Sequence, residues 1–284
     1  MTSPRRGVTL VETLVVTVLA GVAVAVAQGS LWRAQRFYRS QPQVLDVQRG
    51  LRAAAELLAA ELRGLDPSDG DIVAISDTAI TIKVPRALGI LCAPPDGASG
   101  RVLLADRLTF GFRAVDPARD SALLFREGDT LRADDDRWVR AGVGAVSTAA
   151  CPDGSPGTRL VLAAAAGAAD LAGVFAGAPL RTFEVVRYRL YEDGSRTWWL
   201  GQQSYGGGWS ATTPLAGPLR ARDGLRLTYT DAAGAPTMDP TAVRAIGVTV
   251  RGRSLRPVDT PGRRSGAFVD SLTTAVAPRN GARP

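Results

Sequence analysis

The chain has 284 residues, a formal net charge of +7 and no histidine. Without an imidazole, the usual Ser-His-Asp and Cys-His nucleophile pairs, histidine-ligated metals and histidine pH switches are excluded. Two cysteines are too few for a four-thiolate zinc site, and Lys83 is the only lysine among 34 basic residues. We therefore expect no enzymatic activity, no cofactor and no small-molecule substrate.

The composition is that of an ordinary folded chain, with 45% hydrophobic and 21% charged residues. Its length allows one large domain or two small ones with a proper core. A pI near 10.2 suggests an acidic partner, such as nucleic acid or an anionic membrane surface.

An apolar segment lies near the amino terminus. Residues 13–32 carry no charge, and a helix of these 20 residues would be roughly 30 Å long, enough to cross the hydrocarbon of a bilayer. Arg5 and Arg6 precede it, so the positive-inside rule places a short leader, residues 1–7, in the cytoplasm and the following chain outside it. We expect a transmembrane helix over residues 8–31.

Three interpretations of this segment compete. A secretory signal peptide fits its basic start, its apolar middle and the small residues Ala25-Val26-Ala27 before Gln28. A plain membrane anchor fits its length. Glu12 argues against both, because a carboxylate inside an apolar span costs on the order of 2.5 kcal/mol or more and is functional by default.

The third interpretation accounts for Glu12. The run Gly7-Val8-Thr9-Leu10-Val11-Glu12, after Arg5 and Arg6, resembles the class III signal of type IV pilins and pseudopilins. In that signal a short basic leader ends in glycine, and glutamate is the fifth residue after the cut. Val8 replaces the usual phenylalanine at the first mature position, and Thr13 replaces the usual leucine after the glutamate.

The resemblance implies processing and assembly. A prepilin peptidase in the inner membrane would cut after Gly7 and methylate the freed amine of Val8. Subunits would then leave the bilayer and stack their apolar helices into a fibre. The amine of a neighbouring subunit would pair with Glu12, since either buried charge would be costly alone. Glu12 is therefore expected to set the register between subunits and not to act as a catalytic acid.

Residues 32–65 are predicted to continue the helix as an amphipathic segment. Apolar residues recur there at steps of three and four, namely Val44, Val47, Leu51, Ala55, Leu58, Leu62 and Leu65. Most charged residues fall off that stripe, which indicates one buried face. Gly64 and Asp66-Pro67 are typical of a helix end.

Residues 70–250 are predicted to form a β-rich globular domain. The predicted strands are 72–75, 79–84, 108–115, 123–126, 159–163, 183–191, 197–200, 225–229 and 243–250. A long helix followed by many short antiparallel strands predicts an α+β fold, with the helix packed on the sheet as in pilins.

The region from Thr182 to Val250 also resembles larger minor pilins and J-type pseudopilins of type II secretion. The resemblance rests on the order of short motifs, among them Tyr188-Arg-Leu190, Pro218-Leu219 and Gly224-Leu-Arg-Leu-Thr-Tyr229. Major pilins are usually much shorter than 284 residues. Both features favour a large minor subunit.

Cys92 and Cys151 lie in loops of the exported part. In an oxidising periplasm they can form a disulfide, worth roughly 4 kcal/mol for a loop of this size in the chain-entropy model. The alternative is two independent free thiols.

Acidic residues crowd the loop 127–137, including Asp129, Asp134 and Asp136. Such oxygen clusters can bind calcium, and calcium stabilises some pseudopilins. The spacing matches no EF-hand, however, and nearby arginines can neutralise the acids. A solvated hairpin tip without metal is the favoured interpretation.

Aromatic residues surround a glycine run, with Trp198, Trp199, Tyr205 and Trp209 beside residues 206–208. They could form a sugar-binding or partner-binding surface. We favour strand residues that flank a loop.

The positive charge lies at the two ends of the chain. Loss of the leader lowers the net charge from +7 to +5, and residues 251–284 hold seven arginines against two aspartates. The segment between them is therefore neutral by formal count. We expect residues 251–284 to be a basic, flexible tail, and any anionic partner to bind there.

These features predict a minor pilin-like subunit, anchored in the inner membrane with its globular part in the periplasm and then assembled into a fibre. Its role would be to initiate or cap a type IV pilus or a type II secretion pseudopilus, or to couple fibre extension to secretion. Glu12 argues against the apical secretion subunit, which typically lacks this glutamate in that family. The alternatives are a pilus-tip adhesin or DNA-uptake receptor and, less favoured, a hydrolase using carboxylates near Asp134.

Overall fold

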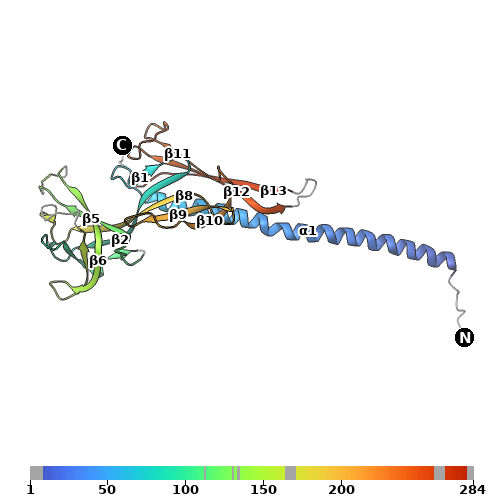
Figure 1. Ribbon diagram of the computed structural model, residues 1–284, viewed down its shortest axis with the longest axis horizontal. Helices are drawn as coiled ribbons and strands as arrows, with labels where there is room; N and C mark the ends of the chain where they lie inside the picture. The colour runs from blue at the N-terminus through green and yellow to red at the C-terminus, as the bar shows by residue number, and fades with distance from the viewer. Residues whose placement is uncertain are drawn as a thin grey trace.

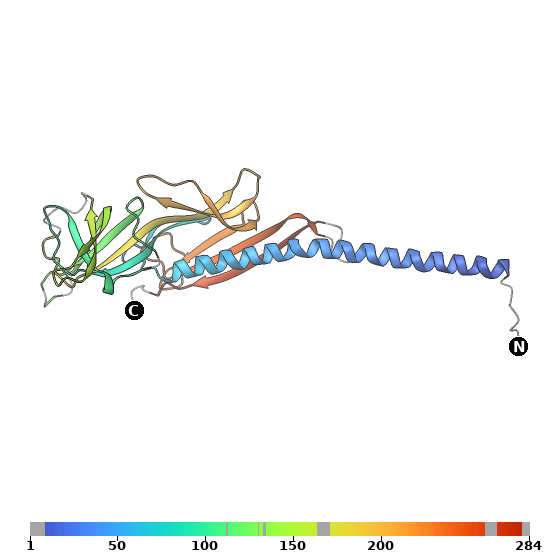
Figure 2. The same cartoon turned by 90° about the horizontal axis from the view of Figure 1, so that it is seen from below.

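The computed structural model describes residues 9–111, 113–129, 131–132, 135–163, 171–258 and 266–279. A single long helix, α1 (Leu10–Arg63), extends from a β-rich globular part (Figures 1 and 2). The remaining elements are β1 (Ile72–Ile75), β2 (Ala79–Ile90), β3 (Arg101–Ala105), the 3-10 turn η1 (Asp106–Leu108), β4 (Phe110–Gly111), β5 (Asp120–Arg126), β6 (Arg137–Ala150), β7 (Pro156–Leu162), β8 (Pro179–Glu192), β9 (Trp198–Tyr205), β10 (Thr213–Leu219), β11 (Leu225–Thr230), β12 (Ala245–Val258) and β13 (Gly266–Val276).

Helix α1 has two halves with different surroundings. Its first half extends beyond the sheet, whereas its second half lies along it (Figure 2). The predicted apolar stripe faces the sheet, and Val47, Leu51, Leu58 and Leu62 are at most 3% exposed. The helix ends at Gly64, the predicted stop. The amphipathic continuation of the apolar helix is thus confirmed.

The stripe of α1 belongs to a first apolar core. The sheet contributes side chains from both its central and its late strands, including Ile82, Tyr188, Leu200 and Val248. All strand pairs of the sheet are antiparallel. The predicted α+β fold, with a helix packed on a large antiparallel sheet, is confirmed.

The strand order is β11-β12-β10-β9-β8-β5-β6-β7-β3, with β2 also paired to β8 and β13 to β12. The segments predicted as strands 183–191 and 197–200 form the hairpin of β8 and β9, whose register runs from Val185↔Tyr205 to Glu192↔Trp198. Its turn closes through the Asp193 carboxylate, which accepts hydrogen bonds from the backbone N–H groups of Ser195 and Thr197.

A second apolar core lies at the end of the sheet remote from the amino terminus, and the sequence patterns do not predict it. It is built from β3, β5, β6 and β7, with Leu124, Leu160 and Leu180 fully buried. The long strand β8 runs through both cores, because Leu180 of β8 lies in the second core and Tyr188 in the first. The globular part therefore has a proximal and a distal core on one continuous sheet.

The predicted strand at 108–115 is wrong. This segment forms η1 and the two-residue strand β4 instead. Leu108 and Phe110 alternate as in a strand, but they are 40% and 67% exposed and enter neither core. Arg113 further interrupts the segment, since its guanidinium turns inward to Asp120.

The predicted flexible tail at 251–284 is wrong for its described residues. Strand β12 continues to Val258, and β13 pairs with it from Ile246↔Val276 to Val258↔Gly266. The arginines of this region obscure an alternating strand pattern, in which Phe268 packs against the proximal core and Val276 is 2% exposed. Residues 259–265 and 280–284 lie outside the described residues.

Candidate functional site

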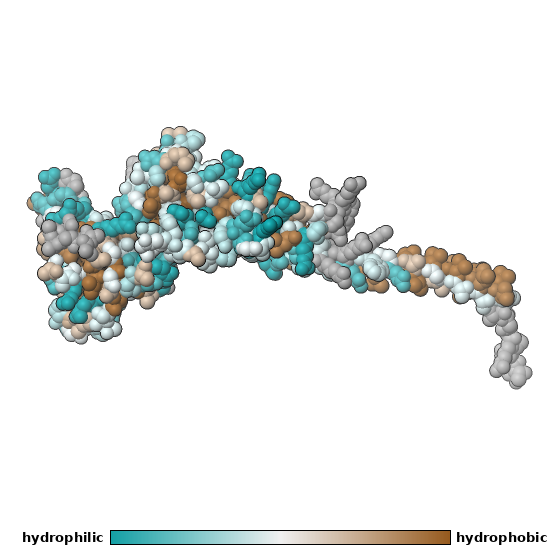
Figure 3. All heavy atoms as spheres, in the orientation of Figure 1, coloured by the Kyte–Doolittle hydropathy of each residue, from teal (hydrophilic) through white to brown (hydrophobic). Residues whose placement is uncertain are grey.

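The first half of α1 is the candidate assembly site. Residues Leu10–Trp32 form a stretch of 23 residues with a mean hydropathy of 2.4, and none of it is buried. Figure 3 shows this apolar surface projecting away from the globular part. Each exposed Val or Leu side chain would gain about 1.5–3 kcal/mol by leaving water. The segment is consistent with a single-pass membrane anchor or a signal sequence.

The hydroxyl groups of this segment, those of Thr13, Thr17 and Ser30, bond to carbonyl groups of the same helix. The Thr17 hydroxyl donates to the Thr13 carbonyl at 2.8 Å, and the Ser30 hydroxyl donates to the Val26 carbonyl at 3.1 Å. Thr13 likewise bonds to Leu10 at 2.9 Å. Because hydroxyl groups bonded in this way need no further partner, the helix presents an apolar surface to its surroundings.

Glu12 is the exception in this apolar surface. It lies in the first turn of α1, where its N–H donates to the hydroxyl of Thr9 at 3.3 Å. Thr9 is the helix cap, and the Thr-x-x-Glu spacing is that of a capping box. Thr9 was not predicted to be the cap, although the Thr-x-x-Glu spacing is visible in the sequence. The Glu12 side chain is exposed, and no described residue bonds to its carboxylate.

The structure does not describe the residues of the predicted processing signal. Arg5, Arg6, Gly7 and Val8 lie outside the described residues. Cleavage after Gly7, methylation of Val8 and the registration role of Glu12 therefore stay predictions.

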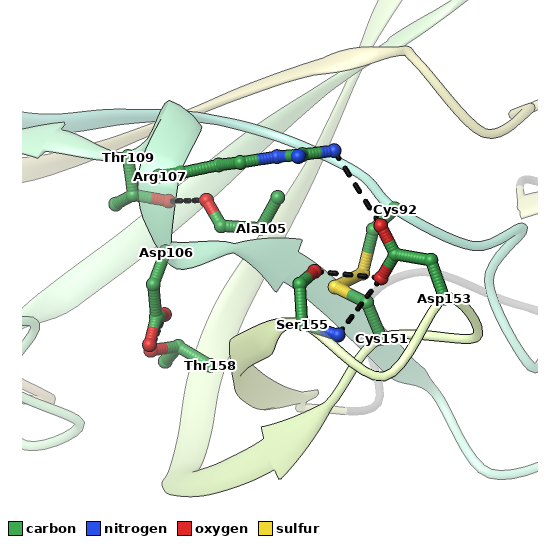
Figure 4. The surroundings of a disulfide bond; sticks show 9 residues. All are labelled: Cys92, Ala105, Asp106, Arg107, Thr109, Cys151, Asp153, Ser155 and Thr158. Carbon is green, nitrogen blue, oxygen red and sulfur yellow. Dashed lines mark hydrogen bonds and ion pairs between the residues drawn. A yellow bond between two sulfur atoms is a disulfide. The ribbon is translucent and has the colours of Figure 1, made fainter.

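Cys92 and Cys151 form a disulfide, as predicted, and their Cα atoms are 5.8 Å apart (Figure 4). The bond joins the segment after β2 to the end of β6 in the distal part. Beside it, Asp153 accepts two hydrogen bonds from Ser155, which hold the pKa of Asp153 below its ordinary value. Arg107 lies 3.5 Å from Asp153 as an exposed ion pair. The disulfide is surrounded by structural contacts.

The acidic loop is the tip of the β5–β6 hairpin. Its carboxylates accept hydrogen bonds from the loop itself, with Gly128 donating to Asp136 and Asp129 donating to Asp135. Asp134 lies outside the described residues. Within the described ranges, no group of three acidic or cysteine side chains could hold a metal ion. The contacts are those of a hairpin tip.

The four aromatic residues do not converge on one site. Trp198 packs against the proximal core, and Trp199 donates its indole N–H to Asp193 at 2.8 Å. Together with Ser195 and Thr197, this bond lowers the pKa of Asp193 to about 2. Trp209 instead stacks on the Arg187 guanidinium at 3.9 Å and meets Tyr205 edge to face.

A buried charged cluster joins the two cores, and the sequence patterns do not predict it. Arg113 donates to both oxygens of Asp120 at 2.8 and 2.6 Å and to Glu184 at 3.0 Å. Arg86 bonds to the same carboxylate of Glu184. Burial alone would raise the pKa of Glu184, but hydrogen bonds and the guanidinium groups hold it below its ordinary value. The partners are far apart in the chain, so no local motif could reveal them.

Comparison with protein-family models, with curated proteins and with solved structures finds no match to the chain. The architecture itself is pilin-like. An amino-terminal apolar helix continues into a helix that packs on a large antiparallel sheet, and the globular part carries a disulfide.

Proposed function

We propose that the chain is a minor subunit of a type IV pilus or a type II secretion pseudopilus. The observation that carries the proposal is the continuity of α1. One helix runs from the exposed apolar segment, with Glu12 in its first turn, into the stripe that fills the proximal core. In a fibre core made of packed helices, such a continuous helix would connect the apolar segment directly to the globular part.

The same continuity disfavours the signal-peptide interpretation. Cleavage at the small-residue site after Ala27 would cut inside α1. A pilin-type cut after Gly7 would instead leave the helix and its Thr9 cap whole. A plain anchor would not require a carboxylate such as that of Glu12 within its apolar segment.

In this proposal the protein performs no catalysis. It is inserted in the inner membrane with its amino terminus in the cytoplasm, and its globular part lies in the periplasm. Its partners are the prepilin peptidase and other subunits of the fibre. The arginine-rich end of the chain is the place for an anionic partner, although Arg251 already pairs with Asp223 at 3.3 Å.

The mature amino terminus is the direct test. We expect mass spectrometry of the protein, expressed with its prepilin peptidase, to find N-methylated Val8 as the first residue. A mature chain that begins at Gln28, or an uncut chain that begins at Met1, would contradict the proposal.

We further expect Glu12→Ala to leave cleavage intact and to reduce incorporation into fibres by at least about tenfold. The reason is that the amine of the neighbouring subunit would be buried without its counter-charge. Incorporation is measured by quantifying the chain in sheared fibres relative to the membrane. Glu56→Ala, which removes an exposed glutamate from the second half of α1, is the matched control. Equal incorporation of both variants would remove the registration role of Glu12.

The second hypothesis, a DNA receptor or adhesin, predicts a different property. If the chain is a DNA receptor, it binds DNA in a salt-dependent manner.

A further inference from the structure

A cleft of about 560 Å³ opens where the proximal and distal cores meet. Gly64, just after α1, and Asp71, just before β1, line one side, and Trp138 of β6 lines another. The paired strands β2 and β8 contribute Lys83 and Phe183. Figure 1 shows both strands in the globular part, remote from the amino terminus.

Apolar side chains make up much of the wall of this cleft. Phe110 of the short strand β4 lines it and is 67% exposed, and Leu88 of β2 is 48% exposed. Neither side chain belongs to one of the two cores. An apolar or aromatic group entering the cleft would cover surface that the described chain leaves open to water.

Two of the three cations that line the cleft, Arg86 and Arg181, are held in ion pairs, and Lys83 is the third. Arg86 pairs with Glu184 at 2.9 Å, and Arg181 pairs with Asp69 at 3.2 Å while stacking on Trp138. In the described part of the chain, no carboxylate forms an ion pair with Lys83. Among the described residues, Lys83 is therefore the cation of the cleft that forms no ion pair, although the Asp71 carboxylate, which also lines the cleft, attracts its ammonium group.

The surroundings of Lys83 favour an incoming anion. Its Nζ atom lies 5.6 Å from the centre of the Phe183 ring, and Arg140 lies over the same ring at 5.3 Å. Burial lowers the pKa of Lys83, because the charged form loses contact with water. The nearby Asp71 carboxylate already accepts the N–H of Asp66 at 3.0 Å. An anion at Lys83 would restore the solvation that burial removes.

We propose that this cleft binds a carboxylate attached to an apolar or aromatic group. Lys83 is the charge partner, and Phe110 and Trp138 provide the apolar contact. A lysine suits this role because its ammonium is a compact charge with three rotatable donors. The carboxylate could come from a small organic acid or from the carboxyl terminus of a peptide. The chemistry that Lys83 recognises is the same in both cases.

The single lysine makes the test specific. The full chain, in non-ionic detergent micelles and labelled with [ε-¹³C]lysine, gives one lysine signal, that of Lys83. We titrate it with N-acetylphenylalanine and with the uncharged N-acetylphenylalaninamide, which controls for partition into the micelle. The acid is expected to shift the signal saturably, and the amide is expected to leave it in place. The same shift with both compounds, or none with either, would overturn the proposal.

Two variants test the assigned contacts, with binding measured by the change in tryptophan fluorescence. Lys83→Met is expected to weaken binding of N-acetylphenylalanine at least about tenfold, the usual effect of losing a charge-assisted hydrogen bond. Arg226→Gln removes one exposed positive charge from β11 and is expected to leave binding unchanged. Phe110→Ala changes an exposed side chain and is expected to weaken binding several-fold, so it carries the test if Lys83→Met does not fold. Undiminished binding in folded Lys83→Met, or in Phe110→Ala, would contradict the assignment.

A third probe identifies the source of the carboxylate. The peptide acetyl-Ala-Gly-Ala-Phe is compared as free acid and as carboxamide. Tighter binding of the free-acid peptide than of N-acetylphenylalanine points to a peptide carboxyl terminus. Equal binding points to a small organic acid. Failure of both free acids to bind would overturn the proposal and would leave the fibre-subunit proposal untouched.

Discussion

Replacing Gly50 with valine is expected to lower the free energy of unfolding by about 3 kcal/mol, the upper part of the usual range for overpacking. Gly50 lies on the buried face of α1, directly against β10. A Cβ atom added there would lie 2.7 Å from the carbonyl carbon of Gly217 and closer still to its oxygen. Backbone atoms cannot rotate away as a side chain can, so the helix must move off the sheet. Helix propensity favours valine over glycine by only a fraction of 1 kcal/mol and cannot offset this cost.

The measurement is urea unfolding of the full chain in detergent, followed by tryptophan fluorescence. Gly29→Val is the matched control, because it lies in the same helix and an added Cβ there meets nothing within 4 Å. We expect the control to unfold at the same urea concentration as the parent chain. A Gly50→Val chain with unchanged stability would mean that α1 does not approach β10 this closely.

The features that follow from local patterns were predictable. The buried face of α1 follows from apolar steps of three and four, because a side chain at Leu58 and one at Leu62 must point the same way. The β8–β9 hairpin follows from strand alternation around the turn at Asp193. The apolar segment and Glu12 follow from hydropathy and from one out-of-place charge. Each of these signals lies within a few residues of sequence.

The features that depend on distant partners were not predictable. The distal core requires β5 to pair with both β6 and β8, a choice that no single strand pattern specifies. The close approach of Gly50 to Gly217 could not be predicted either. Glycine is a poor helix former, and the sequence does not show which residue of the sheet lies against it. Strand β13 was obscured for a different reason. The arginines around it give the segment the composition of a flexible tail, although its apolar residues alternate modestly as in a strand.

The cleft at Lys83 also combines a feature that is visible in the sequence with features that depend on distant residues. The sequence marks Lys83 as the only lysine, but nothing local predicts that it lies among apolar walls and without an ion pair in the described part of the chain. Phe110 was predicted within a strand spanning residues 108–115, but the strand that forms there, β4, has only two residues. Phe110 lines the cleft because β4 is too short to bring it into a core.

Replacing Arg113 with methionine is expected to lower the free energy of unfolding by about 3–5 kcal/mol, the usual cost of leaving a buried charge without its partner. The Asp120 side chain is fully buried, and Arg113 donates to both of its oxygens. After the substitution, the N–H of Asp116 is the remaining donor to Asp120 among the described hydrogen bonds. Because Asp120 of β5 pairs in register with Glu184 of β8, the loss falls on the strand pair that joins the two cores.

Arg107→Met is the matched control for this second effect. The pair of Arg107 with Asp153 is exposed, with side chains 69% and 54% accessible, so its loss is expected to cost less than about 1 kcal/mol. Both variants are compared by urea unfolding at neutral pH.

The double variant Arg113→Met, Asp120→Leu should recover part of the stability, because an apolar pair leaves no charge unpaired. Equal stability of Arg113→Met and Arg107→Met would show that the buried ion pair of Arg113 contributes no more stability than an exposed pair.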